Sequence, residues 1–481
     1  MSSFSILAAA AERPSAVAVI APEGSFSFAD LATRVQRVMA WLQRQPFELP
    51  VTRVSTPAAC VGVVASSDIW TLTLLYALLE LSVPFALIHP RLPAAERNAL
   101  CQRFPISRVF EPDWQLALSA ESPDATANPS AAEAALCIAF TGGTTGFPKA
   151  CVLSRGALEH AVAASEANLG WQPDDRWQLC LSLAHMGGFS IVLRCLAARL
   201  TLILTPPRAS QTPSGQGIDL DSVVRDLTEH RATLISLVPT LLQRLLDRPN
   251  FVAPPHLRAI LIGGDAVSSE TLAQARERRF PVFTSYGLTE MASQVATQRF
   301  SLGPLRDAGN GPPLPGIHVA IDDHGRIRVR GPNLFSGYWN PPTLELPLTE
   351  QGWFCTHDQG SLDADGCLHV LGRDTDLIVS GGENVYPAEV ERAIQRYPTI
   401  SQCCVFGVPD PTWGSLVCAL LVGPQSVSPA LVQHFVEQLM PHQRPRRVAF
   451  VSQLPQTPMG KLDRKAAAQN YLGQLLSLGY H

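Results

Sequence analysis

The sequence predicts an α/β fold: a large N-terminal domain of doubly wound sheets, then a small antiparallel β subdomain, then a small α+β C-terminal domain. Short apolar runs without polar alternation are separated by helical patterns, which is typical of mostly parallel sheets covered on both faces. After about Gly316 the runs become shorter and alternate in polarity, and from Asp374 a separate α+β pattern begins. We therefore expect two domains, residues 1–373 and 374–481.

The expected elements of the N-terminal domain follow from the hydrophobic pattern. A short apolar run at 4–11 has no positively charged segment before it, so it predicts a first helix, capped by Ser2 or Ser3, rather than a signal peptide. Continuous apolar runs predict buried strands at 59–65, 83–88, 135–140, 200–204, 233–238, 259–262 and 282–284. Helical spacing predicts helices at 70–81, 94–101, 189–196, 220–230 and 239–246.

The later part of the chain has a different rhythm. Alternating polarity predicts the antiparallel subdomain from strands at 317–322, 327–330 and 368–371. The last segment predicts strands at 377–380, 402–408 and 417–422, with helices at 387–396 and 429–440. Pro387 followed by Glu389 favours a helix start, because proline suits the first position and an acid suits the first turn.

Composition excludes several classes of protein. With 37 basic and 41 acidic residues among 481, the net charge is −4. The chain therefore lacks the excess of positive charge that is typical of proteins that bind nucleic acids. The longest apolar stretch, 69–88, is interrupted by Glu80 and Pro84 and is too broken to span a membrane. Eleven cysteines without a CxxC pair indicate reduced thiols, and we expect a cytoplasmic location.

The strongest motif is the segment TGGTTGFPK at 141–149, which comes directly after the apolar run at 135–140. Its backbone N–H groups and hydroxyls suit a phosphate, and Lys149 adds positive charge. The spacing is not that of a Walker A loop. The candidate phosphate-binding residues of this loop are Thr141, Gly142, Gly143, Thr144, Thr145 and Lys149.

A second motif, SYGLTE, comes directly after the apolar run at 282–284. It places the hydroxyl of Thr289 beside the carboxylate of Glu290, and such a pair suits a phosphate and its Mg²⁺. The alternative interpretation is a capped helix start. Ser285, Tyr286 and Gly287 complete the candidate segment.

Three further segments add candidates. Asp358 and Arg373 lie near one another in the sequence, and a carboxylate of this kind can accept both hydroxyls of a ribose. Gly381 and Gly382 form a glycine-rich turn where a ligand can pass close to the backbone. Lys461 lies in the segment PQTPMGKLDR. Taken alone, a single lysine on such a turn is ordinarily a solvent-exposed residue without a function.

Together, the order and spacing of these motifs resemble the acyl- and aryl-adenylate-forming superfamily. The resemblance runs from about residue 18 to 464 and includes LAHMGG at 183–188 and LIGG at 261–264. It implies that a carboxylate attacks the α-phosphate of ATP to give an acyl-AMP, from which a thiol, usually CoA, displaces AMP. The implied cofactors are therefore ATP, Mg²⁺ and coenzyme A, and the implied partner is a small carboxylic acid.

The resemblance also implies roles for individual residues. The phosphates would be held by Thr141, Thr144, Thr145 and Lys149, with Thr289 in contact with the α-phosphate. Mg²⁺ would be held by Glu290 and Thr145. The adenine would lie against Gly263 and Gly264, and the ribose would be bound by Asp358 and Arg373. Lys461 is the adenylation lysine on a mobile C-terminal domain whose hinge is Thr375, and whose rotation brings the Gly381–Gly382 segment to the CoA tunnel. The sequence departs from the commonest pattern at Ala150, His357 and Thr375.

The substrate pocket has its own signals. His185 stands where amino-acid-activating members carry an Asp, so α-amino acids are disfavoured and His185 is a candidate gate or pocket wall. Arg194, on an otherwise apolar helix, either pairs with another helix or snorkels to solvent, or it is a clamp for a second carboxylate. The stretches at 181–185, 236–242, 257–264 and 352–358 resemble the o-succinylbenzoate–CoA ligases of menaquinone biosynthesis, whose substrate has two carboxylates.

Three alternatives remain open at this point. One is another aryl-CoA ligase, acting on benzoate or anthranilate, which would not need Arg194. A second is a stand-alone adenylation enzyme that loads a carrier protein, which would need a basic docking patch such as Arg444, Arg446 and Arg447. The third is a non-catalytic adenylate-binding protein, against which the presence of Lys149, Glu290 and Lys461 argues. A homo-oligomer is left open.

Overall fold

The computed structural model describes residues 4–45, 49–50, 56–114, 127, 131–141, 148–205, 218–305, 309–423, 425–456 and 462–480. The chain divides into two compact units. The large unit comprises Met1–Gly264, Ala275–Val319 and Val329–Phe354, and the small unit comprises Asp265–Gln274, Ala320–Arg328 and Cys355–His481. Each unit is described by itself. The boundaries predicted at 373 and 374 stay a prediction.

An eight-stranded sheet forms one layer of the large unit. Its order is β13 (Ser293–Thr297), β12 (Val282–Leu288), β11 (Ala259–Ile262), β10 (Leu234–Leu237), β8 (Arg176–Leu179), β9 (Thr201–Leu204), β1 (Val17–Ala21) and β2 (Gly24–Ser27). The pairs from β12 to β1 are parallel, and β13 and β2 are antiparallel edges. Apart from β8, which carries Arg176 and Gln178, the inner strands each contain a buried apolar run, which is why they lack polar alternation.

A seven-stranded sheet forms a second layer. Its order is β17 (Thr343–Glu345), β16 (Gly337–Asn340), β7 (Lys149–Ser154), β6 (Ala135–Thr141), β4 (Phe85–Ile88), β3 (Cys60–Val64) and β5 (Ile106–Phe110). The pairs among β6, β4, β3 and β5 are parallel, whereas β7, β16 and β17 continue the sheet antiparallel. The chain returns to this sheet from residue 337 onward, so its far edge combines two distant parts of the sequence.

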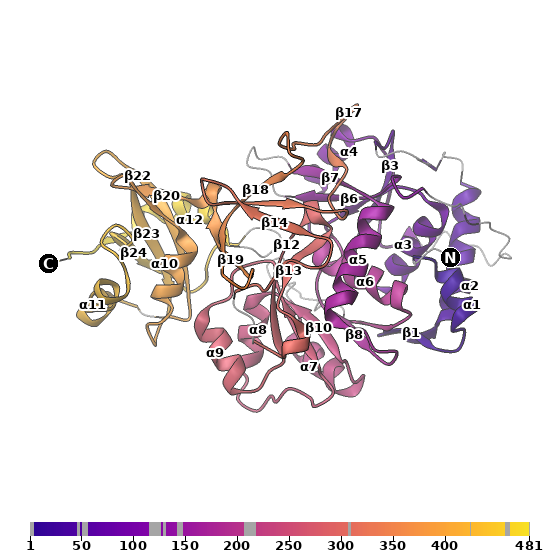
Figure 1. Ribbon diagram of the computed structural model, residues 1–481, viewed down its shortest axis with the longest axis horizontal. Helices are drawn as coiled ribbons and strands as arrows, with labels where there is room; N and C mark the ends of the chain where they lie inside the picture. Colours follow the sequence, from indigo (N-terminus) through magenta and orange to yellow (C-terminus); the bar gives the residue numbers. More distant parts are fainter. Residues whose placement is uncertain are drawn as a thin grey trace. The chain divides into compact units, whose positions relative to one another are not determined.

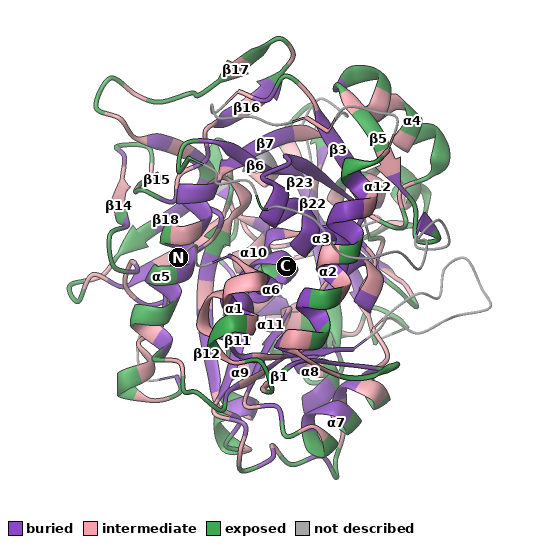
Figure 2. Cartoon of the chain, turned by 90° about the vertical axis from the view of Figure 1, so that its right-hand side faces the viewer, coloured by how far each residue is buried: buried purple, intermediate pink, exposed green. Residues whose placement is uncertain are grey.

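Helices cover both sheets of the large unit. They are α1 (Ile6–Glu12), α2 (Phe28–Gln43), α3 (Ile69–Leu81), α4 (Ala94–Arg103), α5 (Arg155–Leu169), α6 (Met186–Ala198), α7 (Leu220–Glu229), α8 (Pro239–Leu246) and α9 (Ser269–Glu277), of which α9 begins within the small unit. In Figure 1, α5 and α6 lie side by side. Figure 2 shows that β3, β6 and β7 are buried whereas the outer turns of α4 are exposed.

The predicted helix α3 illustrates why some helices lack an amphipathic pattern. Almost every residue from Ile69 to Leu81 is buried, so the helix is apolar on all sides, and Asp68 caps its first turn by accepting from the Thr71 N–H at 2.7 Å. No helix of the described part is long and apolar enough to cross a membrane.

The small unit contains most of a four-stranded sheet and a separate α+β layer. The first sheet has the order β14 (His318–Ile321), β15 (Arg326–Arg330), β18 (Phe354–Leu362) and β19 (Leu368–Arg373). The second contains β20 (Ile378–Ser380), β21 (Glu383–Val385), β22 (Gln402–Asp410), β23 (Gly414–Val422), β24 (Arg447–Phe450) and β25 (Leu476–Ser477), packed with α10 (Pro387–Ile394), α11 (Pro429–Gln438) and α12 (Arg464–Asn470).

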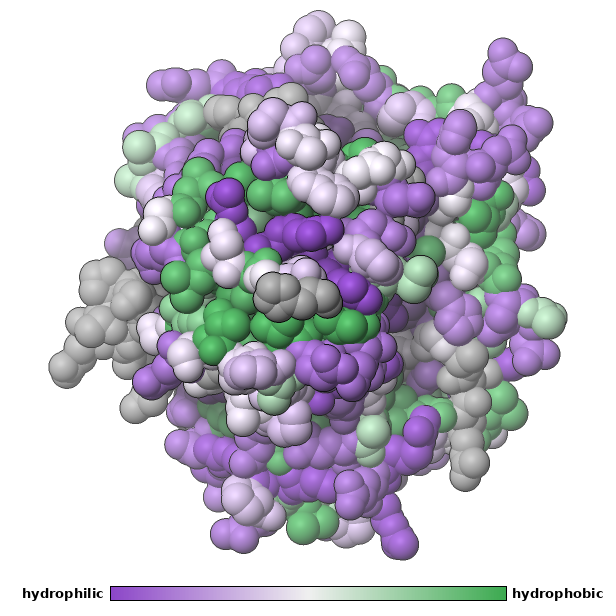
Figure 3. Space-filling model, turned by 90° about the vertical axis from the view of Figure 1, so that its left-hand side faces the viewer, coloured by the Kyte–Doolittle hydropathy of each residue, from purple (hydrophilic) through white to green (hydrophobic). Residues whose placement is uncertain are grey.

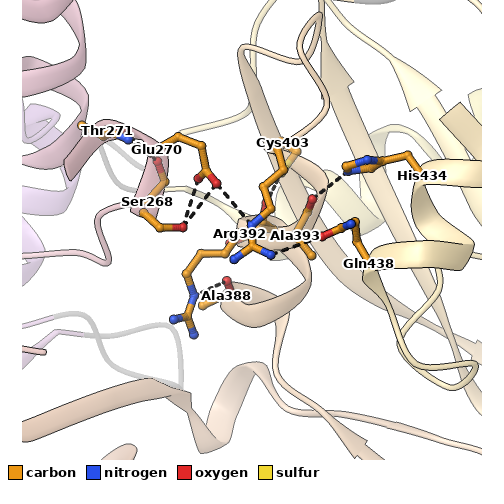
Figure 4. A network of polar contacts seen from close by, with 12 residues as sticks. Ser268, Glu270, Thr271, Ala388, Arg392, Ala393, Cys403, His434 and Gln438 are labelled. Carbon is orange, nitrogen blue, oxygen red and sulfur yellow. Dashed lines mark hydrogen bonds and ion pairs between the residues drawn. The ribbon is translucent and has the colours of Figure 1, made fainter. Parts of the chain in front are cut away.

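Polar contacts fasten the helices of the small unit to one another. Figure 4 shows the side chains of His434 and Gln438 on α11 reaching toward α10. A ring nitrogen of His434 lies 2.9 Å from the Ala393 carbonyl, and Gln438 Oε1 accepts from Arg396 at 3.2 Å.

On the face shown in Figure 3, exposed apolar and polar side chains are interspersed. The exposed apolar residues of the small unit include Met440, Leu472 and Leu476.

The predicted fold class is confirmed, with local corrections. The first helix begins at Ile6, and its cap is Ser5, whose Oγ accepts from the Ala8 N–H at 3.0 Å, rather than Ser2 or Ser3. The strand predicted at 282–284 continues to Leu288, because antiparallel pairing with β13 extends it beyond the apolar run. The next segment, Thr289–Met291, forms one turn of 3₁₀ helix (η2) rather than a capped α-helix.

Candidate active site

The phosphate-loop motif joins two antiparallel strands. Thr141 ends β6 and Lys149 begins β7, and the two residues are paired in register. Gly142, Gly143, Thr144 and Thr145 lie outside the described residues, so their phosphate roles stay predictions. Ala150, the departure after the lysine, is buried in the sheet and leaves the strand intact.

Lys149 and Glu290 meet at one aromatic residue, Tyr338 on β16. The Tyr338 hydroxyl donates to Glu290 Oε1 at 2.7 Å, and Lys149 Nζ lies 4.7 Å from the centre of the Tyr338 ring. Burial and the nearby Glu290 charge raise the pKa of Tyr338, so the hydroxyl stays protonated and acts as the donor. Sequence reasoning missed Tyr338, because no motif containing it was recognised.

The backbone of the SYGLTE motif explains its glycine. A Cβ on Gly287 would lie 1.9 Å from the Ser293 carbonyl oxygen of the neighbouring strand, where the β12–β13 register shifts. Gly287 is therefore required by the close approach of two backbones. Thr289 and Glu290 come next in η2, both half-buried, and the Phe335 N–H donates to the Glu290 carbonyl at 2.8 Å.

Gly263 and Gly264 lie directly after β11, beside the segment that contains Ser285. Ser285 Oγ donates to the Ile262 carbonyl at 3.1 Å, and a Cβ on Gly263 would lie 2.9 Å from that Oγ. Ligands of open α/β sheets bind at the carboxyl ends of the strands, and β11 and the neighbouring parallel part of β12 both end here. The structure thus brings together two segments that the sequence separates, and buried Tyr286 comes next.

His185 lies at the start of α6, and its ring is tilted against that of a second histidine. Its ring centre is 5.5 Å from that of His89, which comes directly after β4. Burial, with a smaller effect from Arg91, lowers the pKa of His89, so the second ring is neutral at pH 7. The carboxyl ends of strands from both sheets of the large unit therefore contribute to this part of the candidate site. Sequence reasoning did not single out His89.

Arg194 lies on the buried side of α6 and is 3% exposed. Its guanidinium carbon is 5.3 Å from the centre of the Trp177 ring, and its Nε has no hydrogen-bond partner. Burial lowers the pKa of Arg194 to about 10. Among the described residues no carboxylate pairs with it, so the interpretation as an internally paired arginine is not supported there.

The predicted ribose-binding pair is formed within the small unit. Asp358 on β18 and Arg373 on β19 are opposite one another in register, and Arg373 Nε donates to Asp358 Oδ1 at 3.0 Å. The arginine side chain is 57% exposed and the aspartate side chain 11% exposed. His357 precedes Asp358 but points to the other side of the strand and is exposed, so this departure leaves the pair undisturbed.

The Gly381–Gly382 turn joins β20 to β21. Both glycines have positive φ, 62° and 84°, as expected of a two-residue hairpin. A Cβ on Gly381 would lie 3.0 Å from the Trp413 ring, and the Gly381 N–H donates to the Trp413 carbonyl at 2.9 Å. The glycines are thus explained by the turn, and a role toward CoA stays a prediction.

The described residues on either side of the segment 457–461 are bonded to one another. Lys461 itself lies outside the described residues. Directly after it, Leu462 forms an antiparallel bridge with Gln456, and the Asp463 N–H donates to the Pro455 carbonyl at 3.0 Å. Arg464 then begins α12, and sequence reasoning gave it no role.

Arg464 joins three elements of the small unit. Its Nη2 donates to Glu391 Oε2 of α10 at 2.8 Å, and its Nε lies 3.6 Å from Asp376 Oδ2. Asp376 ends the 3₁₀ turn η4 (Asp374–Asp376), which contains the predicted hinge Thr375. The side chain of Thr375 is not among those described, and its hinge role stays a prediction.

The comparisons with known proteins agree with this geometry. A model of the AMP-binding enzyme family matches residues 6–339, and a model of the AMP-binding enzyme C-terminal domain matches residues 389–461. The chain belongs to the AMP-binding enzyme family. The predicted superfamily is thereby confirmed, and with it the expectation of an AMP-forming ligase.

Relatives within the family extend over nearly the whole chain. A 2-succinylbenzoate–CoA ligase from Bacillus pumilus is 31% identical over 479 residues, which is 94% of each chain. An o-succinylbenzoate CoA synthetase from Bacillus subtilis, solved with its acyl-adenylate intermediate, has a TM-score of 0.83 and 27% identity and covers 97% of this chain and 98% of its own. The same protein with ATP and magnesium ion has a TM-score of 0.82, with 27% identity and coverage of 96% and 98%.

Proposed function

We propose that this chain is an ATP-dependent ligase that activates 2-succinylbenzoate as an acyl-AMP and transfers the acyl group to coenzyme A, as in menaquinone biosynthesis. The observation that carries the choice of acid is the similarity, over 94% of the chain, to a 2-succinylbenzoate–CoA ligase. The reaction class follows from the family, and the described site supplies groups of the required chemistry.

In the first half-reaction a carboxylate oxygen attacks the α-phosphorus of ATP, and the bond to pyrophosphate breaks. The protein's task is to hold the reacting groups in line and to stabilise the developing negative charge. Lys149 stands at the end of the phosphate loop, and Thr289 offers a hydroxyl for the α-phosphate. Lys461 acts as a point charge between the carboxylate and the phosphate.

The donor chemistry near Lys149 fits a magnesium ion. The half-buried Glu290 presents a carboxylate with one oxygen held by Tyr338, and Mg²⁺ favours one or two carboxylates together with phosphate oxygens and water. Among the described residues no cluster of three or more His, Cys, Asp or Glu side chains forms a closed cage. When bound, the ion neutralises charge on the phosphate oxygens, and we assign Glu290, with Thr145, to hold it.

The nucleoside is assigned to two places. Asp358 offers a carboxylate to the ribose hydroxyls, and Arg373 keeps that carboxylate ionised and oriented. Gly263 and Gly264 present backbone without side chains at the end of β11, with Ser285 and Tyr286 beside them, which suits a flat purine.

In the second half-reaction the CoA thiol attacks the acyl carbon and AMP leaves, after rotation at Thr375 has removed Lys461 and delivered Gly381 and Gly382.

The second carboxylate of the acid is assigned to Arg194. A guanidinium that is 3% exposed and has an unpartnered Nε is incompletely satisfied, and a carboxylate in reach of it would satisfy it. Benzoate or anthranilate has no second carboxylate, so binding of either acid would leave the Arg194 guanidinium incompletely hydrogen-bonded. We assign His185, with its neighbour His89, to the wall of the same pocket.

Loading of a carrier protein finds less support in the structure. Two of the three guanidinium groups of the expected docking patch are used internally: that of Arg446 lies 4.4 Å from the centre of the Trp413 ring, and Arg444 donates to the Leu439 and Val436 carbonyls. All eleven cysteines are free, nine of them buried, which supports the proposed cytoplasmic location.

The test is a pyrophosphate-release assay with ATP, Mg²⁺ and CoA, in which the thioester is identified by mass. The acids are 2-succinylbenzoate, benzoate, anthranilate, a medium-chain fatty acid and phenylalanine. We expect kcat/KM for 2-succinylbenzoate to exceed that of every other acid by a factor of about 100 or more, since one buried ion pair separates them. A preference for a monocarboxylic aryl acid would overturn the assigned substrate, and thioester formation on a carrier protein alone would overturn the acceptor.

A further inference from the structure

We propose that Tyr338 is a positioning residue that holds the metal-binding carboxylate of Glu290 and the phosphate-binding ammonium of Lys149 in a fixed arrangement. The roles given to Glu290 and Lys149 rest on the proposed function. Tyr338 itself belongs to none of the motifs by which the site was recognised. The role assigned to it is to act through these two neighbours.

The strand register brings Tyr338 to this place. On β7, Lys149 and Cys151 are two residues apart, so their side chains lie on the same face of the sheet. Tyr338 on β16 is paired with Cys151, so it is the diagonal neighbour of Lys149 on that face. A diagonal neighbour is within reach of a long side chain, and this explains the 4.7 Å between Lys149 Nζ and the ring centre.

The hydroxyl end of Tyr338 reaches a different sheet. Glu290 lies in η2, the turn that follows β12 of the eight-stranded sheet, whereas Tyr338 belongs to the seven-stranded sheet. Their hydrogen bond of 2.7 Å therefore joins the two layers of the large unit at the candidate site. It fixes Oε1 of the carboxylate and thereby orients the carboxylate toward a cation, and the Cys151 thiol lies beside the same carboxylate.

A residue just before β16 also holds the backbone of Glu290. The Phe335 N–H donates to the Glu290 carbonyl at 2.8 Å, and the Phe335 ring meets the Tyr338 ring edge-on with centres 4.8 Å apart. Glu290 is thus held at its main chain and at its side chain by two residues only three positions apart. Because both the main chain and the side chain of Glu290 are held, little conformational entropy is lost when a cation binds, and this favours binding.

One ring therefore carries two separable contacts. Its hydroxyl orients the metal carboxylate, and its face attracts the ammonium group of Lys149 by a cation–π contact. Tyr338→Phe removes the first contact and keeps the second. Tyr338→Leu removes both, and the difference between the two variants isolates the contribution of the ring face.

The experiment measures metal binding as well as turnover. Mn²⁺ replaces Mg²⁺, and bound Mn²⁺ is counted by electron paramagnetic resonance in the presence of ATP. We expect Tyr338→Phe to raise the Mn²⁺ dissociation constant, and the Mg²⁺ concentration for half-maximal turnover, about tenfold, as for loss of one charge-assisted hydrogen bond. The KM for the carboxylic acid and the binding of ATP in EDTA should stay unchanged. Tyr338→Leu should in addition weaken ATP binding in EDTA several-fold.

A double-mutant cycle separates positioning from plain stability. In a Glu290→Gln background the Tyr338→Phe substitution should have little further effect on Mn²⁺ binding, because Tyr338 acts through that carboxylate. Tyr397→Phe, which removes a hydroxyl from the small unit, is the matched control and should leave the Mn²⁺ constant unchanged. An unchanged Mn²⁺ constant in Tyr338→Phe, or an equal effect with and without Glu290, would overturn the proposal.

These outcomes are distinct from failure of the proposed function. If the wild-type protein prefers another acid, the metal measurements with ATP alone still decide the role of Tyr338. If 2-succinylbenzoate is the preferred acid but Tyr338→Phe leaves metal binding unchanged, the function stands and the positioning role is refuted.

Discussion

Replacing Arg194 with methionine should make the protein more stable and less selective at once. Arg194 is 3% exposed, its Nε is unpartnered, and burial lowers its pKa to about 10 from an ordinary 12.5. At about 1.4 kcal/mol per pKa unit, burial disfavours the charge by roughly 3 kcal/mol. Methionine has a similar shape and removes that cost, although it also loses the contact with Trp177, worth about 1 kcal/mol.

The net gain in the free energy of unfolding is therefore expected to be about 1–2 kcal/mol. For a unit of this size that corresponds to a rise in Tm of roughly 2–4 °C, measured by scanning calorimetry. The same substitution should raise the KM for 2-succinylbenzoate about 10- to 100-fold, because a charge-assisted hydrogen bond to its second carboxylate is lost. The KM for benzoate, measured by pyrophosphate release, should change little.

Arg155→Met is the matched control. Arg155 is also buried, but it donates to the Leu79 carbonyl at 2.8 Å, so its loss should destabilise the protein without changing the ratio between the two acids. The role given to Arg194 would be refuted if Arg194→Met lowered Tm and reduced kcat/KM for both acids equally. That result would make Arg194 a structural residue whose partner is provided by the protein.

Three further outcomes are expected. Lys461→Ala should abolish acyl-AMP formation but spare transfer of the acyl group from preformed acyl-AMP to CoA, with both products measured by mass spectrometry. Equal loss of both steps would contradict a mechanism in which the C-terminal domain rotates Lys461 away between the two half-reactions. Asp358→Asn should raise the KM for ATP roughly tenfold with little change in that for the acid, as one charged partner of Arg373 is lost. Hydrogen bonds from Arg326 and neighbouring backbone outweigh burial and lower the pKa of Asp322 to about 2, so its stabilising contribution is present above about pH 4 and is lost as the pH falls toward 2. Unfolding curves of Asp322→Asn and wild type should therefore differ at pH 7 and converge near pH 2.

The sequence predicted the elements whose signal is local. Apolar runs placed β10 and β11 nearly to the residue, and α8 begins and ends where Pro239 and the helical spacing placed it. The strand β12 was predicted too short, since residues 285–288 are strand only because β13 lies beside them. A pairing partner contributed by a later segment leaves no mark on the local hydrophobic pattern.

The same distinction applies to the candidate site. Lys149, Glu290 and Asp358 belong to motifs in which several neighbouring residues carry the signal together. Tyr338 and His89 do not, because their importance comes from contacts with residues 48 and 96 positions away, Glu290 and His185. Periodicity and motif spacing describe one segment at a time, so contacts between segments had to come from the fold.

The bridge beside Lys461 bears on loop-closure entropy. Gln456 and Leu462 close a five-residue loop, and the Asp463 N–H holds the closure through the Pro455 carbonyl. Doubling the length of such a loop costs only about 0.6 kcal/mol. An insertion beside Gly460 would therefore cost the small unit little of its folding free energy. The stability of the small unit is thus almost independent of the number of residues between Gln456 and Leu462.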